Sequence, residues 1–397
     1  AYVDADLWDI SALLEMPLTE DWSMAVSGRR SYVDAILNNV LPDDGGFSLT
    51  VAPRYWDYQA IVDYHPDAKD NVRFFVFGSD DKMVFVMGND VASNPNFTGG
   101  GDFGVYFHQL QVRWDHKFSK ALSNHVNIGT GYIHSDSAFG GTFQFYSKTV
   151  PIYLRDEFIY EPERFIVIRT GLDNELYWNK WSIRAPNILN VEGEPSDPLL
   201  ANQEILETSG EEWSIRAGWY GEIELLPIKN LRLINGVRID YYSDIQEIGI
   251  DPRFVVRYQV IDGTILKGGV GLFHQRPQAR ETNAEFGNPN LGLINAIHYS
   301  VGIEQRIIQN LEIGVEGFYK DLSNLVVSSG DMVERGGVMV PERYNNDGQG
   351  KVYGLEFMLK HYPTERLFGW ISYTLMKSTR IDHPGSEERP FDYDQTH

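Results

Sequence analysis

The chain has 397 residues, a formal net charge of −22 and no cysteine. The excess of acidic residues argues against nucleic acid as a partner, since phosphate binding needs a basic surface. The lack of cysteine excludes disulfides, thiolate metal sites and cysteine nucleophiles. With 42% hydrophobic residues, no stretch approaches the roughly 20 consecutive apolar residues of a membrane helix. A membrane β-barrel stays open, because its wall is apolar only at every second residue.

Alternation of apolar and polar residues predicts β-strands from one end of the chain to the other. The first strand, over residues 2–14, alternates weakly, and because it begins so early we expect no leader peptide at the start. Further strands are predicted at residues 22–32, 52–64, 72–79, 103–115, 125–134, 143–160, 164–178, 211–225, 231–242, 253–260, 265–274, 296–306, 311–319, 351–362 and 367–377. We expect about 16 to 18 strands in total.

The hairpin over residues 344–378 shows the alternation most clearly. One parity holds Tyr353, Leu355, Phe357 and Leu359, and the other holds Gly354, Glu356, Met358 and Lys360. Each strand here has about ten residues or more, the length that a tilted strand needs to cross a bilayer. The sequence therefore predicts an all-β fold, a large antiparallel up-and-down transmembrane β-barrel.

The connections between the predicted strands alternate between short and long. Long connections are expected at about residues 33–51, 80–102, 181–210, 275–294, 320–350 and 379–390. This alternation is typical of an outer-membrane barrel, which has short periplasmic turns and long extracellular loops. A soluble sandwich or propeller has no reason to keep its long loops at one end. We therefore treat residues 1–397 as one barrel domain.

Charged side chains fall on the parity that is not apolar. In lipid, Arg or Lys at the bilayer midplane costs about 2–4 kcal/mol, so these residues should face the interior of the barrel. The candidates for the lumen are Arg29, Arg216, Glu222, Arg238, Glu312, Glu316, Glu356 and Lys360. Their mixed signs indicate either a wide watery lumen or an interior matched to a polar plug. A simpler alternative is the wet face of an open soluble sheet.

The motifs that resemble catalytic or cofactor-binding signatures lack the neighbouring secondary structure that such sites need. Residues 99–104 fit both a GxGxxG fingerprint and a DFG triplet, but a strand pattern follows them and no helix opens there, so we expect a flexible loop tip. The ten histidines show no metal-ligand spacing. The acidic stretch 192–212 could capture cations, although solvation near lipid headgroups is the more economical explanation. We predict no catalytic residue, no cofactor, no metal site and no enzymatic activity.

Several local motifs together resemble the barrel of a TonB-dependent outer-membrane receptor. They lie at Gly287–Leu291 with Tyr299–Glu304, Phe318–Val326, Asn345–Glu356, Trp370–Ser378 and Arg389–His397, with a weaker match at Arg29–Tyr32. The resemblance covers the whole chain and is strongest over residues 287–397. It implies a barrel that has 22 strands when complete and is filled by a plug. We therefore expect a barrel fragment that lacks the plug and the last strands.

The resemblance also implies a function. The family takes up a scarce ligand, such as a siderophore, vitamin, glycan or peptide, with energy supplied through the TonB complex. The expected partners are outer-membrane lipid, a plug domain and that energy-coupling complex, in the outer membrane of a Gram-negative bacterium. Two alternatives stay open. A passive porin-type channel would work without a plug, and a secreted soluble β-rich adhesin or enzyme would not partition with membranes.

Overall fold

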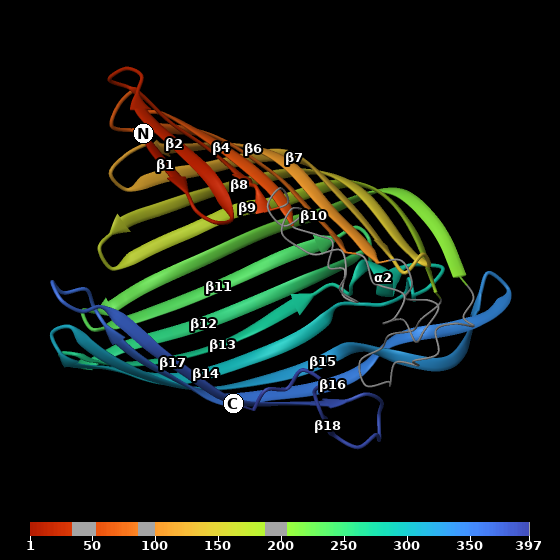
Figure 1. The fold of residues 1–397 in the computed structure, drawn as a ribbon. Helices are drawn as coiled ribbons and strands as arrows, with labels where there is room; N and C mark the ends of the chain where they lie inside the picture. Colours follow the sequence, from red (N-terminus) through yellow and green to blue (C-terminus); the bar gives the residue numbers. More distant parts are fainter. Residues whose placement is uncertain (34–52, 86–99, 187–204, 397) are drawn as a thin grey trace. The chain divides into compact units, whose positions relative to one another are not determined.

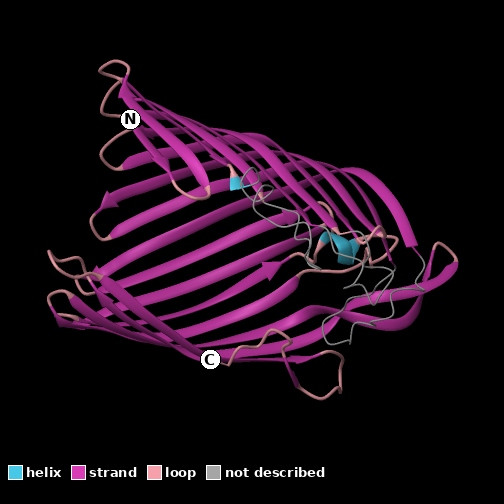
Figure 2. Cartoon of the chain, viewed as in Figure 1, coloured by secondary structure: helices cyan, strands magenta, loops and turns pink. Residues whose placement is uncertain are grey.

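The computed structural model describes residues 1–33, 53–85, 100–186 and 205–396, and nearly all of them lie in strands (Figure 1, Figure 2). One antiparallel sheet contains the eighteen described strands. The predicted all-β, antiparallel up-and-down fold is therefore confirmed, as is the expected number of strands. Among the described helices, none has the length and apolar character needed to cross a membrane. The short helix α2, Ala279–Thr282, is a single turn.

The strands are mostly longer than those of ordinary globular sheets. Their bounds are β1 Tyr2–Ala5, β2 Asp9–Pro17, β3 Trp22–Ser31, β4 Arg54–Tyr64, β5 Asp70–Phe85, β6 Gly101–Lys117, β7 Leu122–Phe139, β8 Phe143–Glu163, β9 Ile166–Pro186, β10 Ile205–Ile228, β11 Leu231–Tyr242, β12 Glu247–Ile261, β13 Thr264–Gln275, β14 Ile294–Ile308, β15 Leu311–Arg335, β16 Val338–His361, β17 Gly369–Ile381 and β18 Arg389–Pro390. Globular strands average roughly five to six residues. Apolar and polar residues alternate over these long segments, so every side chain can remain on the face of the sheet that suits it. The strands can therefore extend well beyond the globular average.

The chain divides into two compact units, which we describe separately. The first contains Ala1–Phe158, Leu172–Ile188 and Ser196–Arg216, and the second contains Ile159–Gly171, Leu189–Pro195 and Ala217–His397. In the first unit, β1 to β7 each pair with the next strand along the chain. In the second, β11 to β17 do the same. This sequential order is the up-and-down arrangement.

The register fixes which residues share a face of the sheet. In the first unit, Asp63 lies opposite Arg73, and Arg73 lies opposite Arg113. In the second, Lys267 lies opposite Gly302, and Gly302 lies opposite Glu316. Directly opposed residues point to the same side, so each series forms a cross-strand row of neighbouring side chains.

One predicted long loop is wrong. Residues 320–350 are mostly strand, because β15 and β16 continue to a tight turn at Gly336 and Gly337. Both glycines have positive φ, at 61° and 83°, as a two-residue turn of type I′ requires. The polar and small residues of this segment carry no apolar alternation. Pairing with the neighbouring strand keeps them extended instead.

The other predicted connections agree with the structure to different extents. Residues 276–293, between β13 and β14, form a loop that contains α2, and residues 382–388 link β17 to β18 without strand. The connection predicted at 33–51 lies almost entirely outside the described residues. Those at 80–102 and 181–210 are shorter than expected at their described ends, since β5 reaches Phe85 and β9 reaches Pro186. Their middle parts lie outside the described residues.

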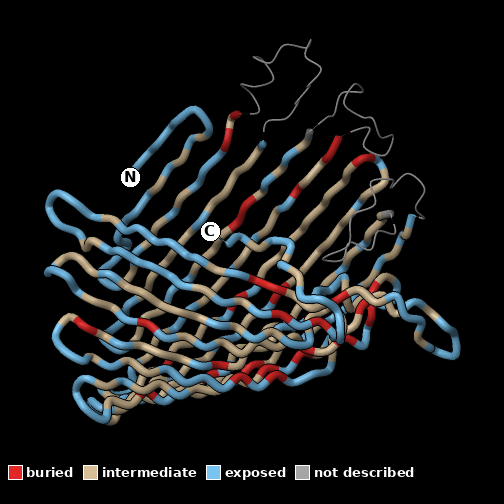
Figure 3. The backbone as a smooth tube through the Cα atoms, turned by 90° about the horizontal axis from the view of Figure 1, so that it is seen from below, coloured by how far each residue is buried: buried red, intermediate tan, exposed pale blue. Residues whose placement is uncertain are grey.

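Little of the described chain is buried (Figure 3). Apart from prolines such as Pro151, the buried apolar side chains are Val33, Tyr242, Leu291, Leu293, Val327 and Tyr344. Four of them come from the loop 276–293 and from the β15–β16 hairpin, which meet. The Asn288 side-chain amide donates to the carbonyl oxygen of Tyr344 at 2.7 Å, and the Gly292 amide donates to Asn346 at 2.8 Å. The other large apolar residues are exposed or half-buried.

Candidate functional site

The sheet has one apolar face that is largely uncovered. In the second unit, Val301, Gly317, Leu355 and Leu375 form one cross-strand row on this face. Val301 is 69% exposed, and Leu355 and Leu375 are 44% and 41% exposed. A water-soluble protein rarely leaves a continuous apolar surface of this extent uncovered. This face therefore suits contact with a medium that is itself apolar.

The first unit also has an apolar face, which aromatic rows border. Trp22 stacks on Tyr64 with ring centroids 4.3 Å apart, and the exposed Trp114 lies in the same cross-strand row. Tyr58 begins a second aromatic row with His108 and Tyr132, six residues from Tyr64 along β4. That spacing is roughly 20 Å along a strand. Apolar residues fill the interval, and the sequence analysis did not identify these paired rows.

The opposite face is polar, and it holds the predicted lumen residues. Two of them lie in the first unit. Arg29 forms an ion pair with Asp57 at 2.7 Å, and its guanidinium lies 5.1 Å from the ring centroid of Tyr55. Arg216 lies 3.8 Å from Glu175. Both cations thus have acidic neighbours on their own unit.

The other predicted residues lie in the second unit. Glu222 accepts a hydrogen bond from Arg169 at 2.8 Å, and Arg238 holds Asp240 with two bonds of 2.6 and 2.7 Å. Glu312 accepts from the Tyr362 hydroxyl at 3.3 Å, and the Lys360 ammonium lies 4.4 Å from the Tyr362 ring centroid. The eight predicted residues therefore do not converge on one site.

A connected group of charges crosses the polar face of the second unit. Lys267 forms ion pairs with Glu316 and, at 3.3 Å, with Glu304. Arg257 donates to Glu304 at 2.6 Å. Glu316 also lies directly opposite Glu356 in the register of β15 and β16. Only Glu316 and Glu356 of this group were predicted. Alternation identifies the face, but the partners depend on register between distant strands.

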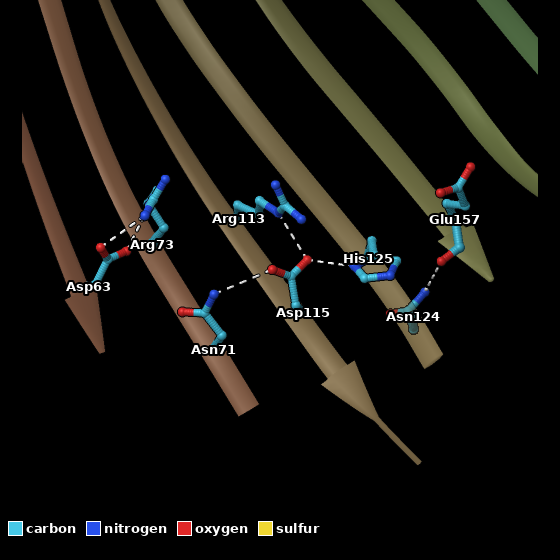
Figure 4. A network of polar contacts seen from close by, with 8 residues as sticks. All are labelled: Asp63, Asn71, Arg73, Arg113, Asp115, Asn124, His125 and Glu157. Carbon is cyan, nitrogen blue, oxygen red and sulfur yellow. Dashed lines mark hydrogen bonds and ion pairs between the residues drawn. The ribbon is translucent and has the colours of Figure 1, made fainter. Parts of the chain in front are cut away.

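A second polar network lies near the short turns of the first unit (Figure 4). Asp115 accepts from Arg113 at 2.9 Å and from Asn71 at 3.4 Å, and its carboxylate lies 2.6 Å from Nδ1 of His125. Beside it, Asp63 binds Arg73 through bonds of 2.7 and 3.0 Å. The sequence analysis missed this network, although Asp63 and Asp115 sit close to the ends of their strands.

Asn124, whose side chain projects to the other face of β7 from that of His125, bonds to the next strand. Its side-chain amide donates to the backbone carbonyl of Glu157 at 3.1 Å. Asn124 is 5% exposed, so this bond satisfies a donor that would otherwise be costly to bury. Separate ion pairs and hydrogen bonds thus link neighbouring strands from β4 to β8 in this region. Such a surface can hold water or a polar protein surface.

The motifs set aside in the sequence have ordinary places in the fold. Gly101 to Gly104 belong to β6, so this part of the glycine-rich stretch is strand rather than the expected loop tip. In the acidic stretch, Glu207, Glu211 and Glu212 lie on β10, and residues 192–204 lie outside the described residues. Among the residues that the structure describes, no cluster of three His, Asp or Glu side chains is arranged to hold a metal ion.

One apolar face, one charged face and long antiparallel strands define the wall of a membrane β-barrel. A family profile described as "TonB dependent receptor-like, beta-barrel" matches residues 44–396. The chain belongs to this family, whose members are receptors and transporters of the Gram-negative outer membrane. No curated protein matches the chain by sequence.

Solved structures share the fold. The outer-membrane transporter YddB from Escherichia coli superposes with a TM-score of 0.68 at 11% identity, covering 96% of this chain and 56% of its own. The ferric-catecholate import receptor Fiu from E. coli K12 gives 0.67 at 9% identity, with 94% and 63% covered. The siderophore receptor PirA from Pseudomonas aeruginosa gives 0.62 at 17% identity, with 94% and 64% covered. The chain spans less than two thirds of each.

Proposed function

We propose that this chain forms most of the barrel of an outer-membrane receptor that imports a scarce ligand with energy from the TonB complex. The observation that carries the proposal is that the sheet, which belongs to the TonB-dependent receptor family, has one apolar face and one charged face. Outer-membrane barrels present an apolar band of about 25 Å to lipid, flanked by aromatic residues. The rows that contain Tyr58 and Tyr64 fit the edges of such a band.

The polar face supports a lumen that receives a plug domain. Its charges are held in pairs across strands, as with Lys267 and Glu316 or Arg73 and Asp63. Fixed charges and oriented hydrogen bonds suit a polar protein surface that must be bound and released, because each bond lost can be replaced by water. We infer the plug and its coupling to TonB from the family to which the chain belongs.

For the ligand, we propose a siderophore or another metal complex as the first class to test. Among the similar folds are a siderophore receptor, a ferric-catecholate receptor and a protein described as a copper transporter. Vitamins, glycans and peptides remain the other classes. The long connections would capture the ligand on the outside of the cell.

Two measurements on the full-length protein test this proposal. Cell fractionation should place it in the outer membrane, and uptake of a labelled ferric catecholate should require both the protein and TonB. Uptake that persists at the same rate without TonB would instead identify a passive channel. Recovery of the protein in the soluble fraction without detergent would indicate a secreted β-rich protein and overturn the proposal.

A further inference from the structure

A cavity of about 330 Å³ lies on the second unit, lined mainly by residues of β12 to β16. Gly269 and Gly271 of β13 form part of its lining, and the Phe273 ring occupies the space over Gly271. The rings of Phe273 and Phe318 contribute apolar walls. The volume falls at the small end of the range for ligand pockets, roughly 300–1,000 Å³. Of the eight predicted residues, Glu316 and Glu356 line this cavity, and the sequence did not identify it as a site.

Three basic side chains follow one cross-strand row through this cavity. Arg253 lies opposite Gly271, Gly271 opposite His298, and His298 opposite Lys320. Directly opposed residues share a face, so all three side chains project from the polar face. Gly271 has no side chain of its own, and the ring of Phe273 lies over it, between Arg253 and His298. Arg253 and Lys320 stand three strand spacings apart, about 14 Å, so their long side chains reach one bound group by leaning toward His298.

Aromatic rings hold the basic groups in place. The Arg253 guanidinium lies 5.0 Å from the ring centroid of Phe273, and the same ring lies 4.5 Å from the imidazole of His298. The Lys320 ammonium lies 5.6 Å from the ring centroid of Phe318. A Cβ atom added at Gly271 would come within 3.0 Å of the Phe273 ring, so glycine permits this arrangement.

These cations differ from their neighbours in lacking acidic partners. On the same face, Arg257, Lys267 and Arg238 each have a carboxylate within ion-pair distance. Among the residues that the structure describes, no carboxylate forms an ion pair with Arg253 or Lys320. The chain has a net charge of −22, so two cations without an ion-pair partner in one cavity make this part of the polar face locally basic.

The acidic residues of the cavity lie away from the basic row. Glu316 and Glu356 line it, and Glu316 is four residues from Lys320 along β15. That separation is about 13 Å along a strand. Glu316 is also engaged by Lys267, which offsets its charge. The cavity therefore has a basic end with aromatic walls and a distant acidic end.

We propose that this cavity binds an oxyanion, a carboxylate or phosphate group carried on a flat apolar body. Arg253 offers the planar fork that matches either group with two parallel bonds, and Lys320 and His298 add positive charge or donors. The flat body lies against Phe273 and Phe318. This inference rests on the proposed function only in that the polar face must be open to solutes, and it would stand if uptake proved independent of TonB.

Fluorine NMR on the full-length protein in detergent tests the proposal. The probes are 4-fluorobenzoate and 4-fluorophenyl phosphate, which separate the two oxyanions, and 4-fluorobenzamide, which has a similar shape without charge. We expect saturable line broadening for at least one anionic probe, weaker at high salt, and none for the amide at equal concentration. Equal binding of the amide, or no saturable binding of either anion, would overturn the proposal.

Variants locate the site. Arg253→Gln and Lys320→Gln should each weaken binding of the anion about tenfold, the usual effect of losing one charged hydrogen-bonding partner. Lys377→Gln is the matched control, because Lys377 lies on the apolar face in the row of Tyr353. It removes the same charge and should leave binding unchanged. An equal loss in the control and in the cavity variants would refute a local site. The salt dependence in the wild type decides the question if a variant fails to fold.

Discussion

Lys267 on β13 forms an ion pair with Glu316 on β15 across the intervening strand, over a position where β14 has no side chain. That position is Gly302, which lies directly opposite both residues. A Cβ atom there would stand 2.9 Å from Cε of Lys267 and 2.9 Å from the backbone oxygen of Val315. Glycine at 302 is therefore required by the close approach of its neighbours.

We expect Gly302→Ala to lower the free energy of unfolding by about 1–3 kcal/mol, the usual cost of forcing an extra group into a filled space. The lysine can move, but the carbonyl of Val315 belongs to the backbone. Urea unfolding of the barrel in detergent, followed by tryptophan fluorescence, measures the change.

Gly317→Ala is the control for this experiment. Its Cβ atom would meet nothing closer than 3.5 Å, a side-chain atom of Leu355 on the apolar face. It should change the unfolding midpoint little. An equal loss in both variants would mean that glycine itself, rather than the space over Gly302, sets the stability.

The ion pair between Lys267 and Glu316 should contribute little by itself. The two side chains are 27% and 26% exposed, and partly exposed pairs are worth about 0–1 kcal/mol because water screens them. A double-mutant cycle with Lys267→Met and Glu316→Gln should give a coupling energy in that range. A coupling of about 3 kcal/mol would show that the face is far less solvated than its exposure indicates.

Asp115 should matter more than Asp63 for the first unit. Asp115 joins Arg113, Asn71 and His125, whereas Asp63 binds Arg73 alone. We expect Asp115→Asn to lower the free energy of unfolding by about 1–3 kcal/mol, since it weakens several bonds to a charged acceptor. Asp63→Asn should cost less than half as much in the same urea titration. The reverse order would contradict the central role of Asp115 in Figure 4.

Neighbouring residues of β17 test which face meets lipid. Leu375 lies on the apolar face, in the row of Val301 and Leu355, and Thr374 lies on the polar face opposite Glu356. Leu375→Arg should destabilise the barrel in lipid vesicles by up to about 2–4 kcal/mol, depending on its depth. Thr374→Arg should be tolerated. Since Leu375 is already 41% exposed, a soluble sheet would tolerate both substitutions equally, and that result would contradict a membrane wall.

Asn288 should anchor the loop 276–293. It is 5% exposed, and its side chain donates to the carbonyl oxygen of Tyr344. Asn288→Ala removes this buried hydrogen bond, at a cost of about 1–3 kcal/mol. Hydrogen exchange of residues 276–293 should accelerate, while Asn290→Ala, at an exposed position, should leave it unchanged. Unaltered exchange in Asn288→Ala would mean that burial of Leu291 and Leu293 alone holds the loop.

The faces of the sheet were predictable because alternation is written into each strand separately. Leu355 and Glu356 are assigned to opposite faces by sequence alone, and the register confirms them. The cross-strand partners were not predictable. His298 meets Lys320 and Arg253 only because β12 to β15 pair in one register, and a shift of one residue would separate them. The prediction of a loop over residues 320–350 failed for a different reason. Ser323, Asn324 and Gly330 are not apolar, so the sequence shows no alternation there, although these residues lie in β15.

The hairpin of β15 and β16 has a practical consequence. The residues of β15 after Ser323 no longer pair with β14, and the residues of β16 before Gln349 do not pair with β17. These two segments pair only with each other and form a two-stranded ribbon. At its tip, Gly336 and Gly337 stand in open space. A short epitope inserted between them should leave the rest of the sheet undisturbed. An antibody to it, applied to intact cells, would then report directly which side of the membrane the long connections occupy.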